Sequence, residues 1–135
     1  MRGFFAGCGV VAIGLISLQL GAVGAQEDAT KPEYYTAKVK PIIDANCASC
    51  HLGTNHKGGL SLNTRESMLK GGRDGVVLVP GDANSLLIKL IRHEGPADDP
   101  MPMPANKPKL SDADIATVTA WVKAGAVMPA APPAP

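Results

Sequence analysis

The apolar positions of residues 33–46 recur three or four residues apart, which predicts one amphipathic helix. Pro41 falls inside this pattern, and we expect it to kink the helix or to mark its effective start. The helix leads directly into residues 47–51, so its register positions that segment. The apolar positions that define it are Tyr35, Val39, Ile42 and Ile43.

Two shorter helices are expected in the middle of the chain. Thr64 is a suitable N-cap for a helix over residues 65–70, which the Gly71-Gly72 pair ends. Farther on, Asp82 or Asn84 caps a helix whose apolar positions are Leu86, Leu87, Leu90 and Ile91.

The last helix has the clearest start and end. Ser111 opens it, with Asp114 at the spacing of a capping box, and Gly125 is its C-cap. We expect Trp121 to lie in the core, where this helix crosses the first. The apolar face consists of Ile115, Val118 and Val122.

Residues 51–63 are rich in glycine and residues 94–109 in proline, so both are expected to be loops. The pattern shows no convincing strand pair and no internal repeat. It therefore predicts an all-α fold of about four helices.

The N-terminus has the pattern of a secretory signal peptide. Met1-Arg2 is followed by an apolar stretch over residues 4–20 and small residues at 23–25. We predict cleavage after Ala25 and a periplasmic mature chain, with an uncleaved membrane anchor as the alternative. The predicted organisation is a signal peptide (1–25), a flexible leader (26–32), one domain (33–126) and a disordered Ala/Pro tail (127–135).

Cleavage would leave about 110 residues, the length of one domain. Without Arg2, basic and acidic residues balance, so the composition gives no indication of nucleic-acid binding. Cys8 would leave with the signal peptide, and Cys47 and Cys50 would be the remaining cysteines. With an aromatic content of 4%, the domain has few large apolar side chains of its own.

Residues 47–51 read CASCH, the attachment motif of a c-type haem. In such a motif each thiol adds across one vinyl group of the porphyrin, which gives two thioether bonds. Cys47 and Cys50 would anchor the haem, and His51 would be the proximal iron ligand. A haem would also supply a large apolar group at the centre of a small core.

Three other interpretations of the CxxC pair were weighed. A zinc site would have to recruit His56 and His93, at spacings that fit no usual zinc finger or ribbon. A dithiol redox centre is expected within a βαβ pattern, which this sequence lacks. A short-range disulfide is possible in an exported protein.

The sixth iron ligand has several candidates. Met101 and Met103 are each followed by proline in the long loop before the last helix, an arrangement that favours an extended chain able to cross the haem face. Met68 is expected to pack in the core, His56 to be solvated, and His93 to lie near the last carbonyls of a helix. Bis-His ligation by His93 is the rival, and Met128 lies in the tail.

The sequence resembles the planctomycete-type cytochrome c domain over roughly residues 39–126. The matching segments are CASCH (47–51), GGLSLN (58–63), LKGG (69–72), VPGDANSLL (79–87) and IRHEGPADDPMPMPANKPKLSDADIATVTAWVKAGA (91–126). The resemblance implies a small cytochrome c-like fold wrapped around one covalent haem c.

The axial methionine of such domains lies in an MPP segment ahead of the last helix. The resemblance therefore implies Met103 as the distal ligand, with Met101 as second choice; Ala105 stands where a second proline is usual. The proximal imidazole also needs an acceptor for its other N–H, for which the Pro80 carbonyl is a candidate.

These features predict a periplasmic electron carrier with His51 and Met103 as axial ligands, not an enzyme. The expected partners are redox proteins or a dehydrogenase complex of which the chain is a subunit, without nucleic acid and without a stable membrane span after cleavage. The alternatives are a haem enzyme or gas sensor with a displaceable sixth ligand, and a non-haem binding module.

Overall fold

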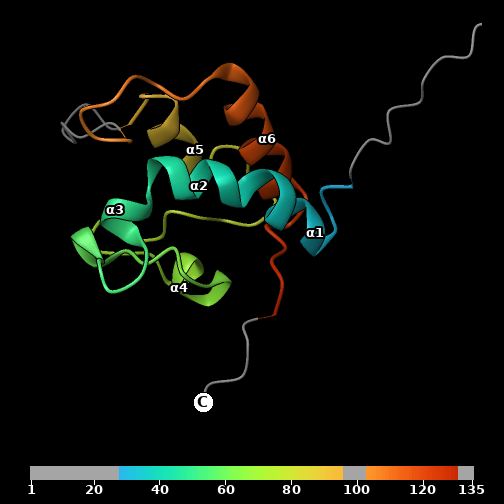
Figure 1. Cartoon of the computed structure of the whole chain (residues 1–135), viewed down its shortest axis with the longest axis horizontal. Coiled ribbons are helices and arrows are strands. Elements are labelled where there is room, and N and C mark those ends of the chain that lie inside the picture. Colours follow the sequence, from blue (N-terminus) through green and yellow to red (C-terminus); the bar gives the residue numbers. More distant parts are fainter. Residues whose placement is uncertain (1–27, 96–102, 131–135) are drawn as a thin grey trace, which may run out of the picture.

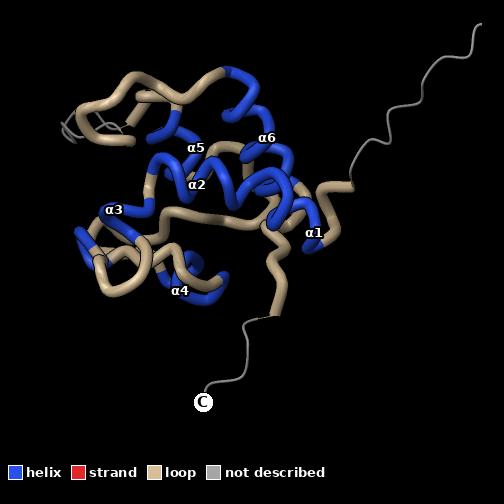
Figure 2. Tube along the Cα trace, viewed as in Figure 1, coloured by secondary structure: helices blue, strands red, loops and turns tan. Residues whose placement is uncertain are grey.

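The computed structural model describes residues 28–95 and 103–130, and in this part of the chain the regular elements are helices (Figures 1 and 2). The prediction of an all-α fold is confirmed for these residues. In chain order the elements are α1 (Pro32–Tyr34), the π-helix η1 (Tyr35–Val39), α2 (Lys40–Asn46), α3 (Ala48–His51), the 3₁₀-helix η2 (Lys57–Gly59), α4 (Arg65–Lys70), α5 (Leu86–Ile91) and α6 (Asp112–Lys123).

The first predicted helix is present, but it is divided around Pro41. A proline lacks the N–H that an α-helix needs, and its ring crowds the carbonyl four residues earlier. Ahead of Pro41 the chain takes the wider π-helical turn, in which the Lys40 amide donates to the Tyr35 carbonyl. Pro41 then lies in the first turn of α2, so it marks the effective start of that helix.

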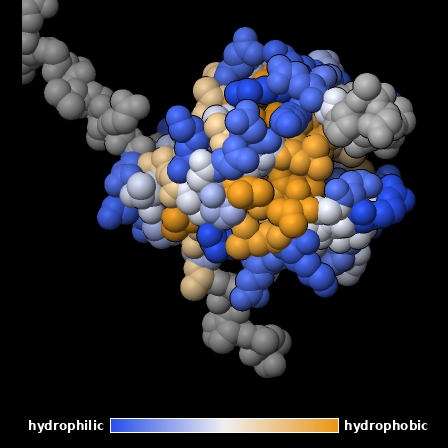
Figure 3. Space-filling model, turned by 180° about the vertical axis from the view of Figure 1, so that it is seen from behind, coloured by the Kyte–Doolittle hydropathy of each residue, from blue (hydrophilic) through white to orange (hydrophobic). Residues whose placement is uncertain are grey.

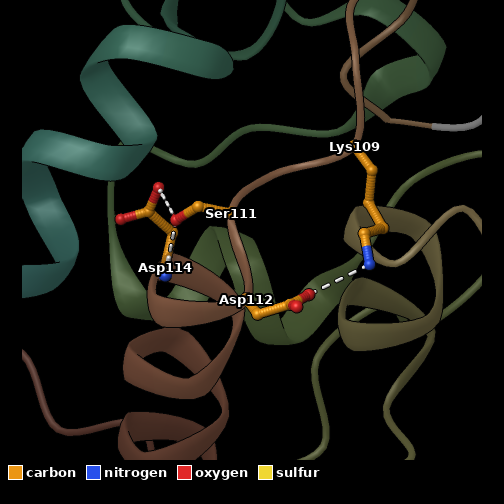
Figure 4. Close-up of polar contacts among 4 residues, drawn as sticks. All are labelled: Lys109, Ser111, Asp112 and Asp114. Atoms are coloured by element: carbon orange, nitrogen blue, oxygen red, sulfur yellow. Dashed lines mark hydrogen bonds and ion pairs between the residues drawn. The ribbon is translucent and has the colours of Figure 1, made fainter.

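Side-chain caps fix the starts of α4 and α6. The Thr64 hydroxyl accepts from the Ser67 amide, and the Ser67 hydroxyl in turn accepts from the Thr64 amide. At α6 the Ser111 hydroxyl accepts from the Asp114 amide at 3.1 Å and donates to the Asp114 carboxylate at 2.7 Å (Figure 4). Both predicted N-caps are confirmed.

The predicted cap of α5 is wrong, because Ser85 and neither Asp82 nor Asn84 occupies the N-cap position. The Asp82 carboxylate accepts from the Asn84 amide and so closes the preceding turn instead. The buried Ser85 hydroxyl bonds the backbone of Val79, through both its N–H and its carbonyl at 3.0 Å. Ser85 therefore ties α5 to the segment before it.

The core forms where α6 packs on the N-terminal helical run, as predicted for Trp121. The Trp121 side chain has no exposed surface, and its ring centroid lies 5.4 Å from that of Tyr35 in η1. Its indole N–H donates to the Val127 carbonyl at 2.7 Å. The Tyr34 hydroxyl bonds the Thr117 carbonyl of α6 at 3.4 Å. These contacts fix the crossing seen in Figure 1.

The end of α6 is joined to the opposite side of the domain. Gly125, with a φ of +102°, reverses the chain, and its amide and that of Ala126 return to carbonyls of the last helical turn. The Arg65 guanidinium of α4 donates to the Gly125 and Ala126 carbonyls at 3.1 and 2.9 Å. The arginine thus links α4 to the C-terminal end of α6.

The predicted boundaries at the two termini are only partly covered. The signal peptide (1–25) lies outside the described residues, as do residues 26 and 27 of the leader and residues 131–135 of the tail. In the described part of the tail, the Val127 carbonyl accepts the hydrogen bond from the Trp121 indole N–H, and Met128 packs against the core.

Candidate haem site

The attachment segment, residues 47–51, lies at the junction of α2 and α3. Cys47 ends α2 and caps α3, and its carbonyl accepts from the amides of Cys50 at 3.2 Å and His51 at 3.0 Å. Residues three and four positions after Cys47 on one helical turn face the same side. The helix that leads into the segment therefore groups two free, partly buried thiols and one imidazole.

His51 is held from both its ring and its backbone. The ring is buried, and Nδ1 lies 3.1 Å from the Leu60 carbonyl oxygen, an acceptor that favours the proton on Nδ1. The His51 carbonyl accepts from the Leu62 amide at 2.8 Å. Ring orientation by a carbonyl on one nitrogen leaves the other, Nε2, as the metal-binding nitrogen.

The predicted acceptor, the Pro80 carbonyl, is replaced by that of Leu60. The chain after η2 runs beside α3, so Leu60 and Leu62 reach the ring and the backbone of the same histidine. Nothing in the sequence around Leu60 marks its carbonyl as the partner, since a backbone acceptor carries no side-chain signature.

Burial raises the pKa of the Cys47 thiol to about 11. The ammonium of Lys107 opposes this shift in the pKa, whereas the neighbouring Cys50 adds to it. Cys47 therefore lies in apolar surroundings, with one cation close enough to affect its ionisation.

In the Met-Pro loop, residues 94–109, the structure describes residues 94–95 and 103–109. The Met103 amide donates to the Leu90 carbonyl of α5 at 3.3 Å, and Pro104 is buried. Four residues after Met103, the Lys107 ammonium donates to the Ala45 carbonyl at 3.2 Å, two residues before Cys47. The loop therefore spans from α5 to the edge of the attachment segment.

The two candidate methionines differ in what is described. Met103 is partly buried, and its amide is bound to the Leu90 carbonyl of α5. Met101 lies outside the described residues. The choice between them as distal ligand stays a prediction.

The other candidate ligands are accounted for in different ways. Met68 is 1% exposed and belongs to the core. His56 is exposed, and its Nε2 contacts the Gly53 carbonyl at 3.1 Å. His93 follows α5 in a left-handed conformation with a φ of +59°, and its Nε2 is buried without a hydrogen-bond partner. No local pattern in the sequence indicates that this nitrogen is unpaired.

The surroundings suit a large apolar group better than zinc. The described residues contain no cluster of three or more His, Cys, Asp or Glu side chains able to hold a metal ion, whereas structural zinc uses four ligands. Leu52 and Leu60, which follow the attachment segment, are partly buried apolar side chains packed on the core. These leucines, the paired thiols and the oriented imidazole fit a covalently held haem. Figure 3 shows in addition that a continuous hydrophobic area lies on the face turned away from the view of Figure 1.

A hollow of about 560 Å³ opens between α6 and the end of α5. It is lined by charged side chains together with Thr119 and the apolar residues Ile115, Ala116 and Ala120 of α6. The attachment segment and Met103 are not among its lining residues. This hollow is therefore separate from the candidate haem site. Its charged lining residues are Arg92, Glu94, Lys109, Asp112 and Lys123.

Residues 47–105 match the family described as Planctomycete cytochrome C. The resemblance read from the sequence is thereby confirmed over this segment. The match begins at Cys47 and extends past Met103, so both parts of the candidate site fall within it, whereas α6 lies beyond its end. No curated protein and no solved structure matches the chain.

The match to a cytochrome c family suggests haem c as the cofactor and electron transfer through haem. The residues that precede and follow the matched segment supply η1, α2 and α6, and η1 packs against both α2 and α6. Among the described residues, no helix has the length and apolar character needed to cross a membrane.

Proposed function

We propose that this cytochrome is a periplasmic one-electron carrier with one covalent haem c and His/Met axial ligation. Cys47 and Cys50 form the thioether bonds, His51 supplies the proximal nitrogen and Met103 the distal sulfur. Bound haem would supply a one-electron Fe(III)/Fe(II) couple, with the electron coming from one redox partner and passing to another.

The contact between His51 and the Leu60 carbonyl is the observation that carries this proposal. At 3.1 Å the carbonyl fixes the ring of a histidine that directly follows a pair of thiols on the same helical turn. The orientation of the ring is therefore set by a contact within the protein. A structural or disulfide-forming CxxC has no need of such an oriented imidazole.

The Met-Pro loop supports Met103 as the distal ligand. The Met103 amide is bound to α5, and four residues later the Lys107 side chain is bound to the end of α2. A thioether is a soft ligand that raises the potential of haem iron relative to bis-His ligation.

Two further parts of the proposal come from the sequence and the family. The predicted signal peptide and the export typical of cytochrome c domains support a periplasmic location. The proposed partners are redox proteins, or a dehydrogenase that binds the chain as a subunit. The covalent attachment would prevent loss of haem outside the cell.

The test is production of the full chain with a cytochrome c maturation system. We expect covalent haem, a near-infrared charge-transfer band in the oxidised protein, and poor carbon monoxide binding in the reduced protein. Met103→Ala should remove the band, and Met101→Ala should keep it. If Met101→Ala alone removes the band, the other methionine is the ligand.

Two alternatives give different results in the same measurements. A high-spin spectrum with rapid carbon monoxide binding would favour a haem enzyme or gas sensor. Absence of covalent haem from the matured protein would favour a non-haem binding module and contradict the main proposal.

His93 is the rival for the sixth position, and its buried, unpaired Nε2 is the observation in its favour. Its amide and that of Met103 both donate to the Leu90 carbonyl, so the two residues have neighbouring backbones. Bis-His ligation would give a low-spin protein that lacks the near-infrared band, and His93→Gln would then make it high-spin.

A further inference from the structure

Lys107 joins two parts of the chain that are 62 residues apart in sequence. Its ammonium donates to the Ala45 carbonyl at 3.2 Å, and its amide donates to the Pro104 carbonyl at 3.3 Å. Its side chain is thus attached to α2 while its backbone closes the turn that follows Met103.

The position of Ala45 explains why a lysine suits this contact. Ala45 lies in the last turn of α2, where carbonyls lack partners within the helix and carry the negative end of its dipole. A cation there is bound by hydrogen bonding and by charge. The same ammonium lies close enough to Cys47 to lower the pKa of its thiol, against the larger effect of burial.

We propose that Lys107 is a positioning residue that holds the Met-Pro loop against the attachment segment and favours the reduced state of the haem. The inference rests on the proposed function. Residues 103–107 of this loop include Met103, so loss of the anchor at Ala45 would let these residues move away from α2 more often. The open state exposes the sixth position.

The charge of Lys107 has a second effect. Reduction adds one negative charge to the haem, and a cation near Cys47 stabilises that charge. Because Lys107 is exposed, salt should screen this effect. Lys107→Gln is therefore expected to lower the reduction potential, and by more at low ionic strength than at high.

Lys109 provides a matched control in the same loop. It lies two residues farther on, and its ammonium pairs with Asp112 at 3.0 Å at the start of α6 (Figure 4). Lys109→Gln removes the same charge without touching α2. Lys107→Arg keeps the charge and the ability to donate to Ala45.

The experiment uses the holoprotein of each variant. It measures the reduction potential at two salt concentrations, carbon monoxide binding to the reduced form, and the near-infrared band. We expect Lys107→Gln to raise the apparent affinity for carbon monoxide about three- to tenfold, because apparent affinity scales with the population of the open state. Its potential should fall below that of Lys109→Gln, and Lys107→Arg should restore both properties.

The proposal would be overturned if Lys107→Gln matched Lys109→Gln in potential and carbon monoxide binding, or if arginine failed to restore them. Substitution of one exposed lysine seldom affects folding, so these variants should be obtained as holoproteins. A wild-type protein without covalent haem or without the near-infrared band would instead contradict the proposed function.

Discussion

The attachment segment and the Met-Pro loop, which would provide the two sides of the proposed haem site, are built in different ways. The attachment segment is one helical turn at the end of a long helical run. Local hydrogen bonds form the turn, and the backbone of Leu60 and Leu62 holds its histidine. The loop has no regular structure in its described part and is held by bonds to α5 and α2.

This difference in construction predicts how substitutions elsewhere in the molecule should affect each side of the proposed site. A turn made by neighbours in sequence needs only a few local bonds, whereas a loop held at distant points opens when one of them is lost. The proximal side should therefore be rigid, and the distal side should be the one that other parts of the molecule regulate.

The largest expected effect comes from the attachment segment itself. The double variant Cys47→Ala, Cys50→Ala should carry no covalent haem, because no thiol remains to form a thioether bond. Met103→Ala should keep its haem through denaturing extraction with acidified solvent. Ser49→Ala, in the same pentapeptide, is the control and should keep the haem as well. Equal haem retention in the double variant and in Met103→Ala would remove the distinction between the two sides.

Substitution of Trp121 tests the hydrophobic core that supports both sides of the site. Trp121→Ala removes a fully buried aromatic side chain that packs on Tyr35, and should lower the free energy of unfolding by about 3–5 kcal/mol. Trp121→Phe keeps much of the side-chain volume, although it loses the hydrogen bond to Val127. It should therefore lower the free energy of unfolding by less than alanine does. Chemical denaturation of the holoproteins measures both values. A smaller cost for alanine than for phenylalanine would contradict the packing described.

Ionisation of Cys47 distinguishes the haem-free chain from the attached one. With its pKa raised from 9.0 to about 11, the thiol should be alkylated roughly a hundredfold more slowly at pH 8 than an ordinary cysteine. Lys107→Gln should slow it further, since the ammonium lowers this pKa. Alkylation followed by mass spectrometry gives the rate, and an ordinary rate at Cys47 in the folded haem-free chain would show that the thiol is not buried.

The same shift has a consequence for stability. A group whose pKa is raised by folding contributes stability that is present below the unfolded pKa, near 9, and is lost as the pH rises through about 11. The haem-free chain should therefore lose stability over that range. A thioether does not titrate, so the holoprotein should lack this contribution from Cys47.

Helix caps give the smallest expected difference between the two sides. Ser111→Ala removes the cap of α6, at the end of the Met-Pro loop, and should cost about 1 kcal/mol. Thr64→Ala removes the corresponding cap of α4 at a similar cost. Only Ser111→Ala should also increase carbon monoxide binding, because only its helix follows the loop. An equal increase in both variants would show that general destabilisation opens the site.

Much of this arrangement could be predicted from the sequence. The helices over residues 65–70 and 112–123, the caps Thr64 and Ser111 and the core position of Trp121 follow from local patterns, and all are present. The division of the first helix follows from the missing N–H of Pro41. The cap of α5 was misassigned because the Asp82 carboxylate bonds within the turn before it.

The sequence by itself determined that two thiols and an imidazole share one helical turn, because this grouping depends only on residues that are neighbours in the chain. The helical run before them is likewise set by local spacing. The tertiary structure alone decided that Leu60 orients His51 and that Lys107 brings the Met-Pro loop to α2. Both contacts use backbone carbonyls, which every residue possesses, so no side-chain pattern predicts them. The partners come together only in the folded chain.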